Sequence, residues 1–471
     1  MKIFYLLQRR TRACLSLCVG DGEGQALALR PPGRFLSIFL LLSLLSVVCA
    51  EGSDWPNFLG PSQNGKSPEE IDIAPWPGAG PRVVWQTDIG TSYGAPTVAN
   101  GKLFIFARHR DMARLSCLDS KTGTERWRFE YPTDYEDMYG YNNGPRCCPV
   151  VDEERVYIFG AEGLLHCVNA FDGALLWKVD TTARFHVVQN FFGVASAPVV
   201  EGELLIVQIG GSPPGSPKNI WGANGKPKPN GSGIVAFDKH TGEVVYQIAD
   251  ELASYASPII ATIKGRRWGL AFLRGGLLGF EPATGTMDFH YPWRHPKIES
   301  VNASSPVIAE DLVFISESYG IGSSVIQVRP GGYRVVWKDN PRRREKAMEL
   351  HWNTAIHHEG YLYACSGQRS NGAELRCVEF KTGKVMWRQR VDERASLLWV
   401  NDYFIYLGEF GRLMLLKCTP EKLEIVSQTV PMDENGKALI QYPAWAAPVL
   451  ADGLLYVRGK DRLVCFALAS Q

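Results

Sequence analysis

The chain has 471 residues, enough for two or three ordinary domains or for one large closed architecture. Its 45% hydrophobic content supports a sizeable core and excludes a disordered chain. With 50 Lys and Arg against 49 Asp and Glu, the net charge of +1 excludes the whole-chain basic field of a nucleic-acid-binding protein, so no nucleic-acid partner is expected.

The first 50 residues have the features of an export signal. Residues 35–48 form an uncharged apolar run that follows Arg30 and Arg34 and is too short for an unstrained membrane span. Val48 and Ala50 place small residues at positions −3 and −1 of a cleavage site. We therefore expect signal-mediated membrane translocation, cleavage after Ala50, and an exported protein in the periplasm or cell envelope.

Two alternatives stay open for this segment. In the first, the apolar run remains uncleaved and anchors the chain in the membrane. In the second, Cys49 carries a lipid anchor, although Val48 stands where lipoprotein signals place Gly or Ala.

From residue 82 onward the chain consists of repeats. One unit has a small residue and proline before two β-branched residues, then Leu-x-Cys-Leu-Asp, then Thr-Gly-x-x-x-Trp. The proline position recurs at intervals of 43 to 60 residues. It is occupied by Pro96, Pro149, Pro198, Pro258 and Pro306, then by Ala355 and Leu398, and finally by Pro448.

Each unit contains four short runs of β-branched and aromatic residues separated by Gly, Asp or Asn turns. Four antiparallel strands cannot bury both faces alone, so the units must stack, and a ring of them leaves only short edges. We therefore predict an all-β fold: an eight-bladed β-propeller of four-stranded antiparallel blades over residues 82–468, after an N-terminal extension over 51–81. The glycine of the Thr-Gly turn supplies a positive φ, and the aromatic four residues later is placed to pack between neighbouring sheets.

The last unit lacks an outer strand, because only five residues follow Phe466. Residues 82–85, Arg-Val-Val-Trp, precede the first unit and share the ending Val-Val-Trp with residues 335–337. We predict that this early strand completes the eighth blade, which closes the ring by pairing the two ends of the chain.

Eight of the eleven cysteines lie after residue 50. Four of them occupy one register of the repeated strand, so they stay a repeat apart and are expected to be unpaired core residues. These four are Cys117, Cys167, Cys377 and Cys465, and the other repeats are expected to carry Ala236, Gly279, Gln327 and Lys417 at this position.

The units resemble those of the PQQ-like eight-bladed propellers, a repeat family that includes pyrroloquinoline-quinone (PQQ) alcohol dehydrogenases and BamB-like outer-membrane assembly lipoproteins. The opening Trp55-Pro56-Asn57-Phe58-Leu59-Gly60-Pro61, followed by Gly65, resembles the start of exported bacterial members. The resemblance covers about residues 54–468. It is specific for the scaffold and not for an activity, because this scaffold hosts enzymes, assembly factors and binding proteins.

In such rings a ligand is expected near the axis, on the face formed by loops that run from each outer strand to the next inner strand. Residues just before each proline position are expected closest to the axis. The alternative is that Asn and Arg at these positions only satisfy loop carbonyls. The predicted ligand-binding residues are Arg146, Asn190, Asn302, His351, Asn353 and Trp445.

Cys147 and Cys148 are adjacent at the start of an inner strand. Quinoprotein alcohol dehydrogenases carry adjacent cysteines that form a strained disulfide against the cofactor, so the resemblance implies a candidate vicinal disulfide here. The alternative is that two small residues serve an ordinary blade start.

A quinoprotein also needs a carboxylate general base beside the quinone and a divalent ion held by further oxygens. The loops contain acids, but none lies in a context that matches the dehydrogenase motif, so no catalytic or metal-ligating residue is assigned. These acids are Asp134, Glu136, Asp137, Glu299, Glu345, Glu349, Asp392 and Glu393.

The sequence therefore favours an exported, monomeric, non-catalytic binding or scaffold protein that contacts another protein or an extracellular polymer through its loop face and needs no cofactor. The alternative is a PQQ-dependent quinoprotein dehydrogenase that oxidises alcohols or sugars and holds PQQ with calcium at the same face.

Overall fold

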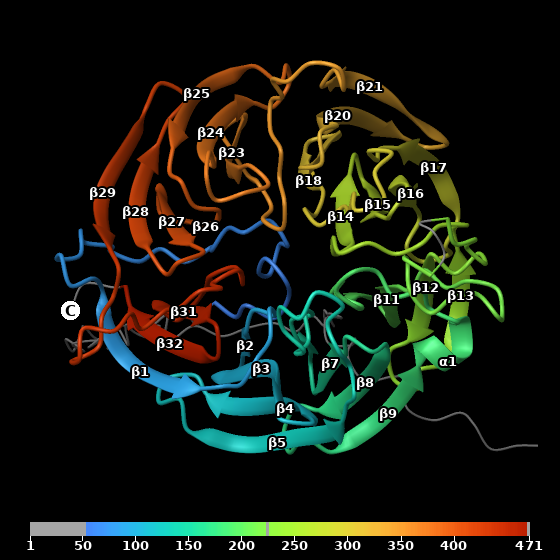
Figure 1. Ribbon diagram of the computed structural model, residues 1–471, viewed down its shortest axis with the longest axis horizontal. Coiled ribbons are helices and arrows are strands. Elements are labelled where there is room, and N and C mark those ends of the chain that lie inside the picture. Colours follow the sequence, from blue (N-terminus) through green and yellow to red (C-terminus); the bar gives the residue numbers. More distant parts are fainter. Residues whose placement is uncertain (1–52, 223–225, 469–471) are drawn as a thin grey trace, which may run out of the picture. The chain divides into compact units, whose positions relative to one another are not determined.

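A computed structural model describes residues 53–222 and 226–468, so the export signal predicted over 1–50 lies outside the described residues. Eight four-stranded antiparallel sheets stand around a common axis (Figure 1), which confirms the predicted eight-bladed propeller. Within the described residues, the helix α1 (Thr181–Phe185) is too short to cross a membrane, and no other helix could do so.

The strands run from the axis outward in each blade. Blade 1 consists of β2 (Thr97–Ala99), β3 (Lys102–His109), β4 (Met112–Asp119) and β5 (Glu125–Pro132); blade 2 of β6 (Val150–Asp152), β7 (Arg155–Phe159), β8 (Leu164–Asn169) and β9 (Leu175–Asp180); blade 3 of β10 (Val199–Glu201), β11 (Leu204–Gln208), β12 (Ile234–Asp238) and β13 (Val244–Ile248); blade 4 of β14 (Ile259–Ile263), β15 (Arg266–Phe272), β16 (Gly276–Phe280) and β17 (Met287–Pro292). Blade 5 consists of β18 (Val307–Ala309), β19 (Leu312–Glu317), β20 (Gly322–Arg329) and β21 (Gly332–Lys338); blade 6 of β22 (Ile356–His358), β23 (Tyr361–Ser366), β24 (Glu374–Glu379) and β25 (Val385–Arg390); blade 7 of β26 (Ala395–Val400), β27 (Tyr403–Gly408), β28 (Leu413–Cys418) and β29 (Leu423–Thr429); blade 8 of β30 (Val449–Ala451), β31 (Leu454–Gly459), β32 (Arg462–Ala467) and β1 (Arg82–Asp88).

Blade 8 joins the two ends of the chain, as predicted. Strand β1 pairs antiparallel with β32, from Arg82 opposite Ala467 to Asp88 opposite Arg462. The two strands lie side by side in Figure 1, with β1 (blue) at the circumference and β32 (red) inside it. The early strand therefore completes the last sheet and leaves no gap in the ring.

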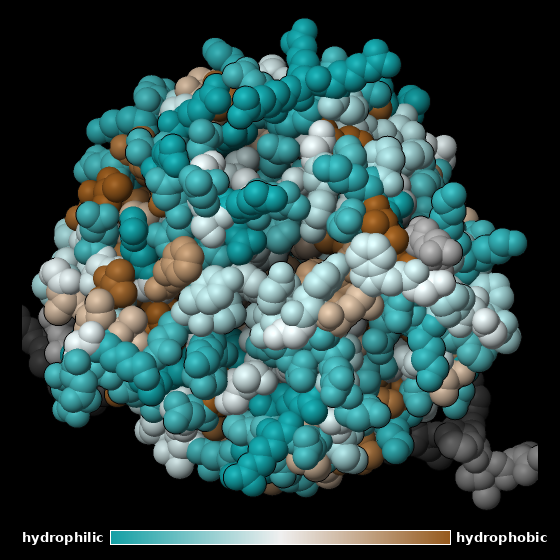
Figure 2. Space-filling model, viewed as in Figure 1, coloured by the Kyte–Doolittle hydropathy of each residue, from teal (hydrophilic) through white to brown (hydrophobic). Residues whose placement is uncertain are grey.

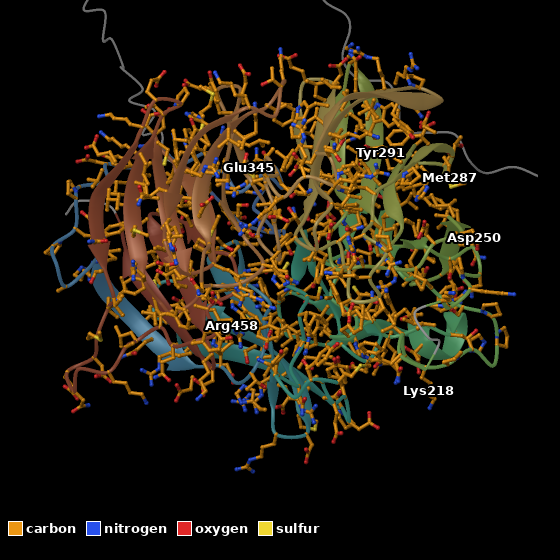
Figure 3. The ribbon with its side chains drawn as sticks, turned by 45° about the horizontal axis from the view of Figure 1, so that its top comes forward. Lys218, Asp250, Met287, Tyr291, Glu345 and Arg458 are labelled. Carbon is orange, nitrogen blue, oxygen red and sulfur yellow. The ribbon has the colours of Figure 1, made fainter. Side chains whose placement is uncertain are left out.

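Burial follows the position of each strand in its blade. The second and third strands are largely buried because both of their faces meet neighbouring blades, whereas the outer strand β5 consists mostly of exposed and partly buried residues. On outer strand β17, Met287 is exposed at the circumference and Tyr291 is buried between blades (Figure 3).

Neighbouring blades contact each other through the aromatic residue of one unit, which packs on the Thr-Gly turn of the next unit. Trp85 donates its indole N–H to the backbone carbonyl of Ser120 at 3.0 Å, and its ring covers Gly123, whose φ of 71° and lack of Cβ permit this approach. The same contact joins Trp177 with Lys239, Trp337 with Phe380, and Trp387 with Thr419. The predicted packing of the aromatic between sheets is confirmed.

Cys117, Cys167, Cys377 and Cys465 are confirmed as buried and unpaired. Gln327 and Lys417, which were predicted to occupy the same register position in blades 5 and 7, do not occupy it. The bulge that follows Cys117 in blade 1 follows Val325 in blade 5 and Leu415 in blade 7, so Gln327 and Lys417 lie two residues too far along. The hairpin between the third and fourth strands is two residues longer in blades 5 and 7 than in blade 1. A register position found by counting a fixed number of residues back from the aromatic position of the fourth strand is therefore two residues off in these blades.

The proline position of blade 7 also needs correction. Val400 pairs with Tyr403 in the first hairpin of blade 7, as Ala99 pairs with Lys102 in blade 1. Leu397, and not Leu398, is therefore equivalent to Pro96.

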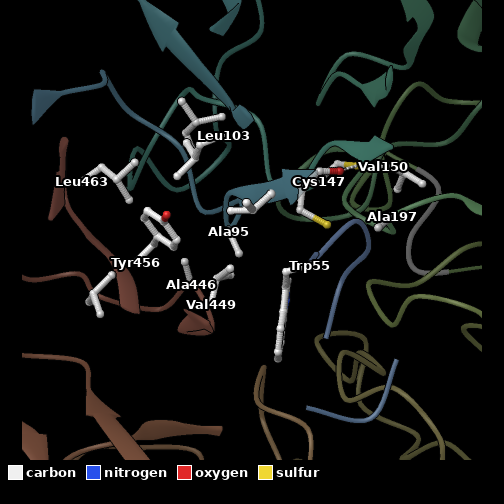
Figure 4. Close-up of a cluster of buried hydrophobic side chains, with 14 of the residues drawn as sticks. Trp55, Ala95, Leu103, Cys147, Val150, Ala197, Ala446, Val449, Tyr456 and Leu463 are labelled. Carbon is white, nitrogen blue, oxygen red and sulfur yellow. Dashed lines mark hydrogen bonds between the residues drawn. The ribbon is translucent and has the colours of Figure 1, made fainter. Parts of the chain in front are cut away.

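The N-terminal extension crosses the central opening of the ring. Trp55 pairs with Val98 of blade 1 through two backbone hydrogen bonds, and Gly65 and Ser67 bond with Trp399 of blade 7. Both contacts lie next to the first hairpin of their blade, so the segment closes the end of the channel opposite the outer-to-inner loops. The ring of Trp55, 2% exposed, is buried among residues at the starts of inner strands (Figure 4).

Candidate functional site

The loop face contains a cavity of about 520 Å³ on the ring axis. All eight outer-to-inner connections contribute to its lining, which places it centrally. Phe58 and Leu59 of the N-terminal extension also line it, and because this extension crosses the opposite end of the channel, they form its floor. The cavity is therefore a closed cup and not an open channel.

One wall of the cup is an aromatic group from the loops before blades 2, 3 and 4. We call it the Tyr139 cluster; it consists of Tyr139, Tyr141, Phe191, Phe192 and Tyr255. Its ring centroids lie 5.6 to 6.4 Å apart where the rings contact, which is the usual range for packed aromatic pairs. Tyr141 is 63% exposed, so one face of this packed wall is open to a ligand.

The opposite wall comes from blades 6, 7, 8 and 1. We call it the Trp445 cluster; it consists of four lining residues, Tyr93, Trp352, Tyr442 and Trp445, and of Phe410, which packs against Tyr442. Trp445 contacts Trp352 at 5.3 Å and Tyr93 at 5.0 Å between ring centroids. Tyr442 is 48% exposed and stacks on Phe410 at the rim.

A buried ion pair supports the Trp445 cluster. Nη2 of Arg394 lies 2.6 Å from Oε2 of Glu409, and the indole N–H of Trp445 donates to the same oxygen at 2.9 Å. Burial alone would raise the pKa of Glu409, but hydrogen bonds from Arg394, Ser370 and Trp445 outweigh it and lower the pKa to about 2. The guanidinium lies 4.2 Å from the ring centroid of Trp352, a cation–π contact that fixes the indole.

His351 extends this network. Its Nδ1 lies 3.3 Å from Nη1 of Arg394, and its Nε2 lies 3.3 Å from the hydroxyl of Tyr319. Since a guanidinium only donates, Nδ1 accepts and the proton sits on Nε2, which donates to Tyr319. Burial and then the charge of Arg394 lower the pKa of His351 to about 3, so the ring is neutral.

A second buried ion pair comes from the loop between β5 and β6, which also carries Tyr139 and Tyr141. Arg146 binds Asp137, and both side chains are almost fully buried. The guanidinium also faces the rings of Tyr93 and Tyr135, with 5.2 and 5.1 Å to the centroids. The two buried or nearly buried cations of the lining, Arg146 and Arg394, are thus already paired with carboxylates.

The predicted ligand-binding residues divide into two groups. Arg146, His351, Asn353 and Trp445 line the cavity, and their ligand binding stays a prediction. Asn190 and Asn302 do not line it, and their amides hold loops in place. Asn190 donates to the carbonyl of Ala253 and accepts from Arg274, while Asn302 donates to the carbonyl of Leu273.

The adjacent cysteines lie just before β6, and both are buried. Cys148 lines the cavity, whereas Cys147 donates its S–H to the backbone carbonyl of Cys148. Burial raises the pKa of Cys147 to about 12. The vicinal disulfide stays a prediction.

Comparison with known proteins places the chain in a family. The family profile described as outer membrane protein assembly factor BamB matches residues 111–346, half of the chain. The chain belongs to this BamB-like PQQ-repeat family.

Individual relatives are distant. A BamB of Shewanella oneidensis is 30% identical over 108 residues, which covers 21% of this chain and 27% of that protein, so the match spans about a quarter of the relative. The crystal structure of BamB from Moraxella catarrhalis is 12% identical, with a TM-score of 0.54, over 83% of this chain and 98% of that one, and shows a shared fold. A europium-containing methanol dehydrogenase, 11% identical over 88% of this chain and 98% of that one, reaches a TM-score of 0.47.

The alternative expected from the sequence, PQQ held with calcium, requires a matching set of polar groups in the lining. PQQ carries three carboxylates and is held with calcium, which takes six to eight oxygen ligands. Among the candidate acids only Glu299 lines the cup, and it is exposed; Asp137 is paired with Arg146 and Glu393 with Arg412. In the described part of the chain no three His, Cys, Asp or Glu side chains are grouped as metal ligands. The residues present do not fit a calcium-bound quinone.

Several lining residues are not among those predicted from the sequence. Tyr319 and Gln368 come from hairpins between the second and third strands of their blades, which reach the same face as the outer-to-inner loops. Tyr93 lies in the loop after β1, which becomes an outer-to-inner connection only once the ring closes. These hairpins could have been predicted from the antiparallel order of the strands, because the second strand of each blade ends on the face where the first strand begins.

Proposed function

We propose that the protein is a non-catalytic binding protein of the cell envelope that holds a partner in the aromatic cup of its loop face. The observation that carries this proposal is the cup itself: two aromatic walls, a floor supplied by Phe58 and Leu59, and buried charges that are already paired. Pockets of this size and apolar character are typical ligand sites. The name of the related BamB proteins, outer membrane assembly factors, supports an envelope location.

The titratable groups of the cup support binding and not proton transfer. Glu409 and Asp137 are locked in ion pairs, and His351 uses both ring nitrogens in hydrogen bonds. A general base needs a free lone pair within reach of its substrate. Such groups are better suited to hold aromatic walls in place.

The test combines a turnover assay with a ligand search. The purified exported protein is incubated with PQQ, calcium, alcohols or sugars and an artificial electron acceptor, and no acceptor reduction is expected. Thermal shift across sugars, peptides, quinones and metals is then expected to find a ligand that raises the Tm of the wild type but not of a Tyr141→Ala, Tyr442→Ala double variant. Reproducible PQQ-dependent turnover would overturn the proposal, as would ligands whose stabilisation is unchanged in the double variant.

A further inference from the structure

We infer that the cup binds a neutral oligosaccharide segment of an extracellular polymer, an inference that rests on the proposed binding function. The argument uses the wall chemistry, the charge of the lining, and the size of the cavity. Each of these separates a neutral sugar from another ligand class.

The walls offer stacking platforms. Tyr141 and Tyr442 are 63% and 48% exposed and belong to opposite walls, and each packs against a further ring, Phe192 and Phe410 respectively. The face of an aromatic ring carries a negative quadrupole, so it attracts the positively polarised C–H groups on the face of a pyranose. Because the backing rings pack against the platforms, little side-chain freedom is lost when a sugar stacks on them.

The charge of the lining favours a neutral ligand. Arg146 and Arg394 are paired with buried carboxylates, so an anionic ligand would have to compete with Asp137 and Glu409. A cation between the rings of the Tyr139 cluster is also disfavoured, because those rings already contact one another and leave no cage. A sugar brings no charge to be desolvated.

The rim offers groups that both donate and accept hydrogen bonds, as sugar hydroxyls do. The amide of Gln368 and the hydroxyls of Tyr141 and Tyr442 belong to this class. Arg369 and Glu299 add one exposed charge of each sign. Figure 2 shows a face that is largely hydrophilic, with residues of intermediate hydropathy across its centre, and this polarity disfavours an acyl chain.

The volume sets the length of the ligand. A cavity of about 520 Å³ lies within the range of about 300–1,000 Å³ found for small-molecule pockets. It accommodates a few sugar units and not a folded domain. The open rim lets a longer chain leave the cup on either side, so a polymer is bound through a short segment.

The test measures binding of neutral oligosaccharides of three to six units, built from glucose, xylose, mannose or N-acetylglucosamine. Calorimetry and the fluorescence of Trp352 and Trp445 are the readouts. We expect saturable binding of at least one series, weakened at least tenfold by Tyr141→Ala and by Tyr442→Ala. The Tyr→Phe variants keep the ring and are expected to bind within about threefold of the wild type.

Phe171→Ala is the matched control. Phe171 is an aromatic side chain, 80% exposed, in the turn between β8 and β9 at the other end of blade 2, and its removal is expected to leave affinity unchanged. Circular dichroism and Tm of each variant establish that the fold is intact before affinities are compared.

The outcomes separate this inference from the proposed function. If no neutral series binds while a peptide or an acidic polymer stabilises the wild type and not the Tyr141→Ala, Tyr442→Ala variant, the sugar is wrong and the binding function stands. Sugar binding that both single alanine variants retain would place the sugar elsewhere and overturn the inference. PQQ-dependent turnover would overturn both.

Discussion

Arg394 and Glu409 meet beside Trp445, with Nη2 of the arginine 2.6 Å from Oε2 of a carboxylate that has no exposed surface. Removing one member of a buried pair leaves the other charged and unsolvated, which costs about 3–5 kcal/mol. We predict that Arg394→Leu lowers the free energy of unfolding by about this amount, measured by urea denaturation.

The double variant Arg394→Leu, Glu409→Gln is the control for that prediction. It removes the stranded charge, so its loss of stability is expected to be smaller than that of Arg394→Leu alone. A loss below about 1 kcal/mol in the single variant, as for an exposed pair, would contradict the buried geometry.

The pH dependence of stability is predicted from His351. Its pKa is lowered from 6.5 to about 3 in the folded protein, so between these values the unfolded chain binds more protons than the folded one. The contribution of His351 is therefore fully present above pH 6.5 and is lost as the pH falls toward 3, by up to about 1.4 kcal/mol per pH unit. We predict that the Tm difference between wild type and His351→Gln narrows from pH 7.5 to pH 4.5.

Tyr319→Phe controls for the hydrogen bond of that histidine. It removes the hydroxyl that faces Nε2 but keeps the buried ring, so its pH profile is expected to stay parallel to that of the wild type. A constant Tm difference between wild type and His351→Gln across this range would show that the imidazole is accessible to solvent.

The ring closure is tested by comparing two equivalent tryptophans. Trp85→Ala and Trp387→Ala both remove a partly buried inter-blade indole, so each is expected to cost less than the about 3–5 kcal/mol of a fully buried tryptophan. Hydrogen exchange should separate them: Trp85→Ala loses protection in β1 and β32 together, at both ends of the chain, whereas Trp387→Ala loses it in blades 6 and 7. Protection of β32 that is unchanged in Trp85→Ala would contradict closure by β1.

The N-terminal extension is predicted to be part of the folded ring. Trp55→Ala opens a cavity at the axis and is expected to lower stability by about 3–5 kcal/mol, measured by denaturant unfolding. Phe171→Ala also removes a large aromatic side chain, but an exposed one, so its free energy of unfolding is expected to stay within about 0.5 kcal/mol of the wild-type value. Equal effects of the two variants would mean that the extension does not pack in the channel.

The adjacent thiols are predicted to be unreactive in the folded protein. Burial raises the pKa of both Cys147 and Cys148, so hardly any reactive thiolate forms at pH 8. Iodoacetamide followed by mass spectrometry should label the peptide that contains them only after denaturation. A peptide that resists labelling in denaturant and is two hydrogens lighter would instead demonstrate the vicinal disulfide.

The sequence was sufficient for the scaffold because its signals are local and repeated. The Thr-Gly turn and the aromatic four residues later recur in most blades, and Val-Val-Trp at 83–85 shows where the missing outer strand lies. The register prediction was wrong in blades 5 and 7, where Val325 and Leu415 occupy the predicted position. Each of these hairpins contains two additional residues, and the repeat pattern alone does not show on which side of the register position they lie.

The cup was predicted less completely because it depends on contacts between distant residues. Arg394 meets His351 across 43 residues, and Phe58 reaches the floor only because its segment crosses the whole ring. Asn190 and Asn302 precede inner strands as expected, yet their amides turn to neighbouring carbonyls. Sequence position indicated the correct face but not the direction in which a side chain points.

The antiparallel pairing of β1 with β32 places Arg82 beside Ala467, so the chain enters and leaves this hairpin-like junction at the same end. Tension applied to the two termini of the propeller would separate these strands one hydrogen bond at a time. This geometry resists force less than one in which all the hydrogen bonds of the pair are loaded together. The packing of Trp55 at the axis changes this, because a pull on the amino terminus reaches the buried indole before it reaches Arg82. The extension thus acts as a mechanical anchor that keeps tension at the amino terminus from reaching the pairing of β1 with β32.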